Sequence, residues 1–148
     1  MTDLESGPSA HLSWWELGCH DGTPYPQEFR TDRAPELARA FERIRELCEF
    51  ALIVDSAYRT TEYNASIGGA AGSQHIQGRA LDLKPAAMPK GALGRYQDRL
   101  NRLLSAAKKA RSEKLLNGIG IYDGFIHIDT RPGTQVTWYG SRTSNTPK

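Results

Sequence analysis

The sequence is poor in cysteine and has no long hydrophobic run. Its two cysteines, Cys19 and Cys48, are too few for a disulfide framework, and Cys48 falls on the apolar side of a predicted helix, where a buried thiol is expected. No stretch approaches the roughly 20 apolar residues that span a bilayer. Residues 1–15 carry acids and no apolar segment, so no signal peptide is expected. We therefore expect neither membrane insertion nor a disulfide-stapled secreted fold.

An excess of charge of one sign is also missing. The chain has 19 Lys and Arg against 17 Asp and Glu, a formal net charge of +2 over 148 residues. A nucleic-acid binder concentrates basic residues on one face, so no nucleic-acid partner is expected. The local excess at Lys108, Lys109, Arg111 and Lys114 is typical of the solvated end of a helix, where cations suit the helix dipole. The length suits one domain, which we expect to be a monomer.

Hydrophobic periodicity predicts a succession of helices and strands. Helices are predicted over residues 31–48, 62–66 and 93–109, and short strands over 52–54, 80–84, 118–122, 125–130 and 135–139. The dipeptide Asp123-Gly124, between two alternating strands, is the strongest short-range signal for a hairpin. This order predicts an α+β fold in which a small antiparallel sheet is flanked by helices. We expect a flexible leader at 1–12, one domain at 13–140 and a polar tail at 141–148.

Two of the four histidines lie in segments that suit a metal site. His75 precedes Asp82 in the sequence Ser-Gln-His-Ile-Gln-Gly-Arg-Ala-Leu-Asp, and His127 is the centre of Phe-Ile-His-Ile-Asp. Strand alternation turns Asp82 and His127 away from their apolar neighbours. A catalytic zinc ion takes three ligands of these types and keeps a fourth position open. Spacing alone leaves two interpretations open: a metal site, or histidines that serve a surface loop and the core.

The predicted hairpin register adds detail to this face of the sheet. Asp129 shares the face of His127, because side chains two residues apart in a strand point the same way. A two-residue turn at 123–124 places Gly120 opposite His127 and Gly118 opposite Asp129. We expect the space beside these glycines to accommodate a metal and a substrate.

The same residues carry a resemblance to a known family. The pattern S-x-H-x-x-G-x-A-x-D over residues 73–82, followed by His127, resembles the signature of the zinc D-Ala-D-Ala carboxypeptidase family. These are peptidoglycan peptidases related in fold to lysostaphin-type enzymes and to the zinc domain of hedgehog proteins. Segments 56–64, 68–69, 118–122 and 125–131, together with Trp138, resemble its small single-domain branch common in phages. The resemblance spans roughly residues 13–140 and implies the zinc fold of that family.

The resemblance also implies roles for single residues. His75, Asp82 and His127 would bind one zinc ion. Arg59 lies where the family places an arginine that grips a substrate carboxylate, an anion that a guanidinium fork pairs with bidentately. Ser73 would bind substrate or shape its loop.

The general base is where this chain departs from the family pattern. Many relatives have Glu or Asp three residues before the last zinc histidine, and here that position is Gly124. Asp123, one residue earlier, is already the first residue of the predicted turn. Asp129 is the preferred candidate, either as the catalytic base or as a partner that orients a zinc ligand.

The resulting expectation is a zinc-dependent peptidase that cuts peptidoglycan stem peptides or cross-links, as a carboxypeptidase or an endopeptidase. Without a signal peptide it would be made in the cytoplasm and act on the cell wall after holin-type release or as part of a phage particle. Two alternatives remain. One is a zinc-bearing wall-binding module without a base, which Gly124 favours, and the other is a metal-free structural component of a phage particle.

Overall fold

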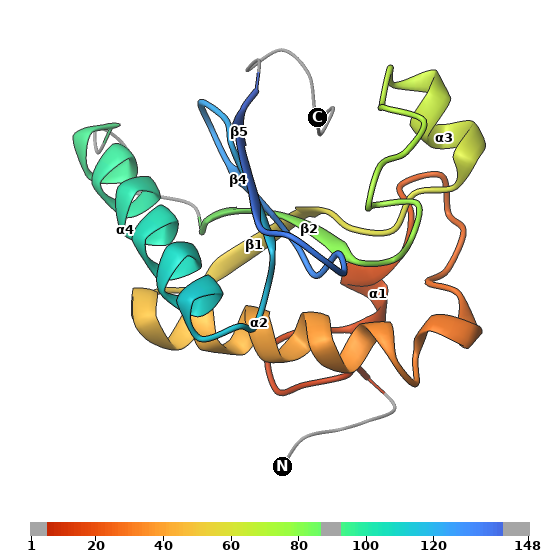
Figure 1. The fold of residues 1–148 in the computed structure, drawn as a ribbon, viewed down its shortest axis with the longest axis horizontal. Helices are drawn as coiled ribbons and strands as arrows, with labels where there is room; N and C mark the ends of the chain where they lie inside the picture. The colour runs from red at the N-terminus through yellow and green to blue at the C-terminus, as the bar shows by residue number, and fades with distance from the viewer. Residues whose placement is uncertain (1–5, 87–92, 141–148) are drawn as a thin grey trace.

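The structure of this chain is a computed structural model that describes residues 6–86 and 93–140. Figure 1 shows two long helices below and beside a twisted sheet, with a short helix and its loops on the opposite side. In chain order the elements are α1 (Trp14–Leu17), the 3-10 helix η1 (Gln27–Phe29), α2 (Arg33–Cys48), β1 (Leu52–Ser56), α3 (Thr61–Ser66), β2 (Ala80–Pro85), α4 (Leu93–Ser112), β3 (Gly118–Ile121), β4 (Ile126–Asp129) and β5 (Val136–Tyr139).

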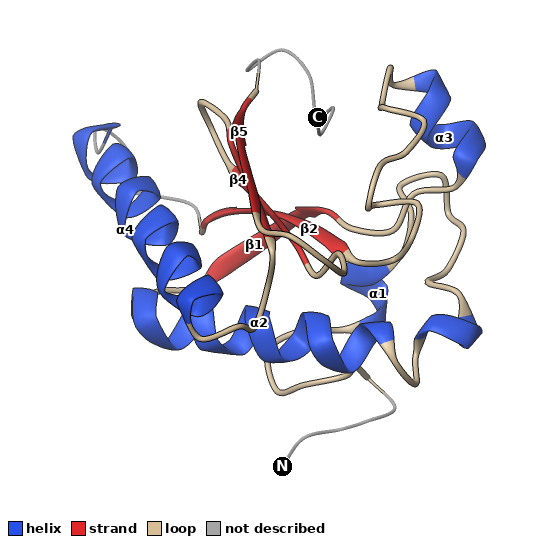
Figure 2. Cartoon of the chain, viewed as in Figure 1, coloured by secondary structure: helices blue, strands red, loops and turns tan. Residues whose placement is uncertain are grey.

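The described strands form one five-stranded sheet with the order β1-β2-β4-β3-β5. All neighbours are antiparallel except β3 and β5, which pair in parallel. The predicted α+β class with a small, mainly antiparallel sheet is therefore confirmed, as Figure 2 shows. The fifth strand is parallel to β3 because the connection after β4 passes β3 before β5 begins, so that β5 pairs with β3 instead of with β4.

The three predicted helices form as α2, α3 and α4, whereas α1 and η1 were not predicted. The side chain of Asp32 accepts a hydrogen bond from the Arg33 N–H at 2.7 Å and caps α2. The helix ends at Cys48, and the next residue, Glu49, caps it with a left-handed backbone of φ 63°. Its buried residues recur at helical spacing, with Leu37, Phe41 and Ile44 all at most 1% exposed. This apolar face packs against α4 and the sheet.

One face of the sheet belongs to this hydrophobic core. Alternate residues of the three inner strands are fully buried among the helices, namely Leu81, Leu83, Ile119, Ile126 and Ile128. Strand alternation therefore turns Asp82, His127 and Asp129 to the opposite face. The hydrophobic pattern of three short strands thus decides on which side the polar residues gather.

The predicted hairpin register is confirmed, but the predicted use of its space is wrong. Gly120 pairs with His127 and Gly118 with Asp129. A side chain at Gly118 would collide with the carboxylate of Asp129, and one at Gly120 would lie 2.6 Å from the indole of Trp138. The glycines therefore make room for these two side chains and not for a metal or substrate.

The start of the described chain packs against α2. Ser9 Oγ donates to Glu42 Oε2 at 2.7 Å, the backbone N–H of His11 donates to the same oxygen at 2.8 Å, and Leu12 is 2% exposed. The proposed division at residue 13 stays a prediction, and residues 1–5 and 141–148 of the predicted leader and tail lie outside the described chain. No helix in residues 6–86 and 93–140 has the length and apolarity to cross a membrane.

The close approach of Trp138 to Gly120 yields a stability prediction. Gly120→Ala should lower the free energy of unfolding by about 1–3 kcal/mol, because the added methyl displaces a packed indole. Gly124→Ala is the matched control, since a methyl there meets nothing within 4 Å and should change stability by only about 0.5 kcal/mol. Urea unfolding of both variants measures the difference, and equal midpoints would show that the indole does not hold this position.

Candidate metal centre

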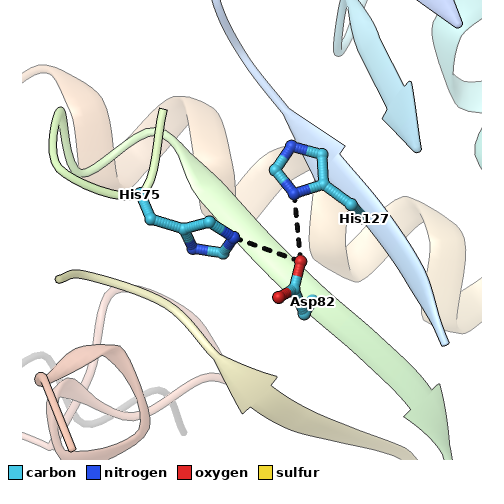
Figure 3. Close-up of side chains that lie close together, drawn as sticks. All are labelled: His75, Asp82 and His127. Carbon is cyan, nitrogen blue, oxygen red and sulfur yellow. Dashed lines mark hydrogen bonds and ion pairs between the residues drawn. The ribbon is translucent and has the colours of Figure 1, made fainter. Parts of the chain in front are cut away.

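Three side chains from distant parts of the sequence meet on the polar face of the sheet. His75 comes from the loop before β2, Asp82 from β2 and His127 from β4, as Figure 3 shows. Asp82 Oδ1 lies 3.1 Å from His75 Nε2 and 3.0 Å from His127 Nδ1. All three candidate ligand atoms lie within 4.8 Å of one another, and the side chains are at most 1% exposed. This is the one group of its kind that the described residues contain.

The loop around His75 holds its ring in one orientation. The backbone N–H of His75 donates to Ser73 Oγ at 3.2 Å, and its carbonyl accepts from the Arg59 N–H at 3.1 Å. The ring nitrogen Nδ1 lies 2.6 Å from the Ala57 carbonyl oxygen, which can only accept. Nδ1 therefore carries the proton, and Nε2 presents its lone pair to Asp82.

His127 is held in the same manner by a carboxylate. Its Nε2 lies 2.8 Å from Asp129 Oδ2, on the opposite side of the ring from Asp82. With the proton on Nε2, the lone pair of Nδ1 faces Asp82 Oδ1. Both rings thus turn a lone pair toward one carboxylate oxygen.

This arrangement favours a positive charge, a proton or a metal ion, between the rings and the carboxylate. A neutral imidazole has one N–H, yet each ring lies between two acceptors, so one acceptor of each ring is left facing a lone pair. A cation removes that repulsion. Two ligands of tetrahedral zinc lie about 3.3 Å apart, close to the 3.1 and 3.0 Å that separate Asp82 Oδ1 from the two ring nitrogens. The three residues therefore fit a metal ion.

The electrostatics of the cluster favour ionised carboxylates. Burial raises the pKa of Asp82, but His75 and His127 lower it by more, so it lies below its usual range. Burial lowers the pKa of His75 and favours its neutral ring. For His127, burial also lowers the pKa, but hydrogen bonds with Asp129 and Asp82 outweigh it and raise the pKa. The two carboxylates beside His127 thus favour positive charge on its ring.

Each carboxylate of the cluster also has its own arginine. Arg59 Nη2 lies 3.3 Å from Asp82 Oδ2, while Arg131 donates to both oxygens of Asp129, from Nε at 2.8 Å and from Nη2 at 2.7 Å. Buried ion pairs of this kind offset the cost of removing charge from water. Arg59 and Arg131 therefore keep the two carboxylates charged and fixed.

A comparison with family models decides which family this geometry belongs to. The model described as peptidase M15 matches residues 10–129, which is most of the chain and includes all three candidate ligands. The chain belongs to the peptidase M15 family. This is the zinc D-Ala-D-Ala carboxypeptidase-like family that the motifs predict, so that prediction is confirmed. A comparison with curated proteins gave no match.

Membership of the M15 family supports a metallopeptidase, and the structure shows where the other predicted site residues of this M15 chain lie. Ser73 is buried in the His75 loop. Arg59 is 0% exposed and also donates to Ser56 Oγ and Asn64 Oδ1, each at 3.2 Å. Asp123 is exposed in the turn after β3. The metal-ligand set is thus brought together, while the substrate contacts of Arg59 and Ser73 stay predictions.

Two side chains beside this candidate metal centre received no role from the sequence. Arg131, two residues beyond the end of β4, holds Asp129. The sequence could have indicated this contact, because side chains two residues apart in an extended chain point the same way. Trp138 packs its ring 5.0 Å from that of His127 and donates from Nε1 to the Tyr122 hydroxyl at 3.1 Å. Its contact depends on the parallel pairing of β5, which the sequence pattern does not reveal.

Proposed function

We propose that this protein is a zinc-dependent peptidase that hydrolyses a peptide bond in the stem peptides or cross-links of bacterial peptidoglycan. The observation that carries the proposal is that one candidate ligand atom from each of His75, Asp82 and His127 lies within 4.8 Å of the other two. The other nitrogen of each histidine ring is hydrogen-bonded to the protein. The M15 family match supports the same reaction class.

His75 Nε2, His127 Nδ1 and Asp82 Oδ1 are the proposed zinc ligands. Three protein ligands with a fourth position open is the arrangement of a catalytic zinc site. Bound there, zinc supplies Lewis acidity to a scissile carbonyl and lowers the pKa of water toward about 7. Arg59 holds Asp82 Oδ2, which leaves Oδ1 for the ion.

We assign Asp129 to positioning and not to proton transfer. Its Oδ2 receives the His127 Nε2–H, and both of its oxygens accept from Arg131. This carboxylate lies on the side of the His127 ring that faces away from Asp82, so it fixes the tautomer that a zinc ligand needs. Asp123, exposed in the turn, is the remaining candidate for the general base.

The burial of the centre bears on how substrate reaches it. Arg59 and the three ligands are at most 1% exposed, so a stem peptide reaches them only after neighbouring side chains move. Trp138, which is partly exposed and packs on His127, is one such side chain.

We propose that the enzyme serves phage-type lysis or wall remodelling.

The second candidate function is a zinc-bearing module that binds the wall without cutting it. Gly124 occupies the position where many relatives carry an acidic residue, and the buried ligands favour a structural metal. This module would retain zinc and bind peptidoglycan, yet release no fragments from it.

The positioning role of Asp129 is tested by Asp129→Asn. An asparagine keeps the shape but loses the charge that holds the His127 Nε2–H, so zinc affinity should fall about 10–100-fold. Competition against a chromogenic chelator measures this affinity. Asp123→Asn is the control and should bind zinc as the wild type does. Unchanged zinc affinity together with abolished hydrolysis in Asp129→Asn would restore the general-base role.

The reaction itself is tested on purified peptidoglycan. The zinc-loaded protein should release fragments whose masses identify the bond that is cut, and a strong chelator should stop their release. Mass spectrometry of the soluble products, followed by addition of zinc to the chelated sample, is the measurement. A zinc-loaded protein that binds several wall types but releases nothing from any of them would favour the binding module.

A further inference from the structure

A concave site lies at the end of the sheet where β2 begins and β4 ends. It has a volume of about 270 Å³ and is bounded by the first turns of α2, the loop between α4 and β3, and the residues that follow β4. Neither the metal ligands nor Arg59 line it. The cavity is therefore separate from the metal centre and needs an explanation of its own.

Positive charge dominates this cavity. Arg39, Arg79 and Lys114 line it, and no carboxylate in residues 6–86 and 93–140 forms an ion pair with any of them. Glu36 is the one acidic residue in the lining, so these three cations and Glu36 together carry a net charge of +2 before Arg131 is counted. Arg131 also reaches the cavity, but its guanidinium is bonded to Asp129.

The cations, and not the hydroxyl of Thr130, are the groups that an anion in the cavity can reach. Thr130 lines the cavity, but its hydroxyl oxygen is buried and is not open to it. Arg39, Arg79 and Lys114 therefore carry the binding.

We propose that this cavity binds a phosphate group. Arginine forks match the oxygens of phosphate, and lysine binds phosphate as a point charge. Lys108 and Lys109 lie exposed on α4, as the helix-end interpretation predicts, whereas Lys114 is an exposed residue beyond the end of that helix. Lys114 follows the end of α4 in a left-handed backbone conformation with φ 67°, which places it at the cavity instead of on the helix.

The phosphate has two chemically equivalent sources, a phosphodiester polymer of the bacterial surface and free phosphate. Both present the same tetrahedral oxygens to the cavity. A polymer would hold the protein at the wall. The proposal does not depend on peptidase activity, because it concerns binding alone.

Calorimetric titration of the full chain with inorganic phosphate tests the site, with a chelator present so that phosphate cannot bind through a metal. The wild type should bind, and binding should weaken as salt screens the charges. Arg79→Gln and Lys114→Asn should each weaken binding roughly tenfold or more. Asparagine tolerates the left-handed backbone at position 114, so that variant should remain folded. Lys108→Gln removes a charge elsewhere and should bind like the wild type.

A glycerol phosphate oligomer in a parallel titration separates the sources. Tighter binding of the oligomer, lost in the same two variants, supports a polymer, and equal affinity per phosphate supports free phosphate. Both results keep the anion site. Absence of phosphate binding by the wild type, or equal binding by Arg79→Gln, Lys114→Asn and Lys108→Gln, would overturn it.

Discussion

The pairing of β2 with β4 is the constraint on which the metal centre depends. It places Asp82 directly opposite His127, at the short separation that lets one carboxylate oxygen face a ring nitrogen. A slip of one residue would turn Asp82 into the core and an isoleucine or leucine out of it. The buried apolar residues of both strands prevent that slip. The hydrophobic core thus fixes the geometry of a polar site that lies on the other side of the sheet.

The buried carboxylates of the site need counter-charges close by, and these contacts also make the site rigid. Asp82 and Asp129 are almost completely buried, and an ionised carboxylate without a counter-charge is unstable in such a place. Arg59 and Arg131 supply the counter-charges from flanking loops. Each histidine has an acceptor on both sides but, when neutral, only one N–H. The excess of acceptors over donors therefore lies between the two rings, at Asp82. The proposed zinc ion would balance it.

The sequence predicted the parts of this site that depend on local pattern. Strand alternation and the glycine register placed Asp82, His127 and Asp129 on one face, and the motif around His75 identified the third ligand. It could not tell which ring nitrogen of His127 meets Asp129, because that choice depends on side-chain rotation. Nor could it show that Trp138 fills the space at Gly120, since a parallel pairing between β3 and β5 has no local signal. Long-range contacts decided what the pattern left open.

The most direct test of the account is a crystal structure of the protein with zinc, with diffraction recorded on both sides of the zinc absorption edge. The account predicts one anomalous peak bounded by His75 Nε2, His127 Nδ1 and Asp82 Oδ1, at about 2.0–2.2 Å from each. Asp129 should remain hydrogen-bonded to the far nitrogen of His127. A peak elsewhere, or zinc bound through His127 Nε2 or by Asp129 itself, would contradict it.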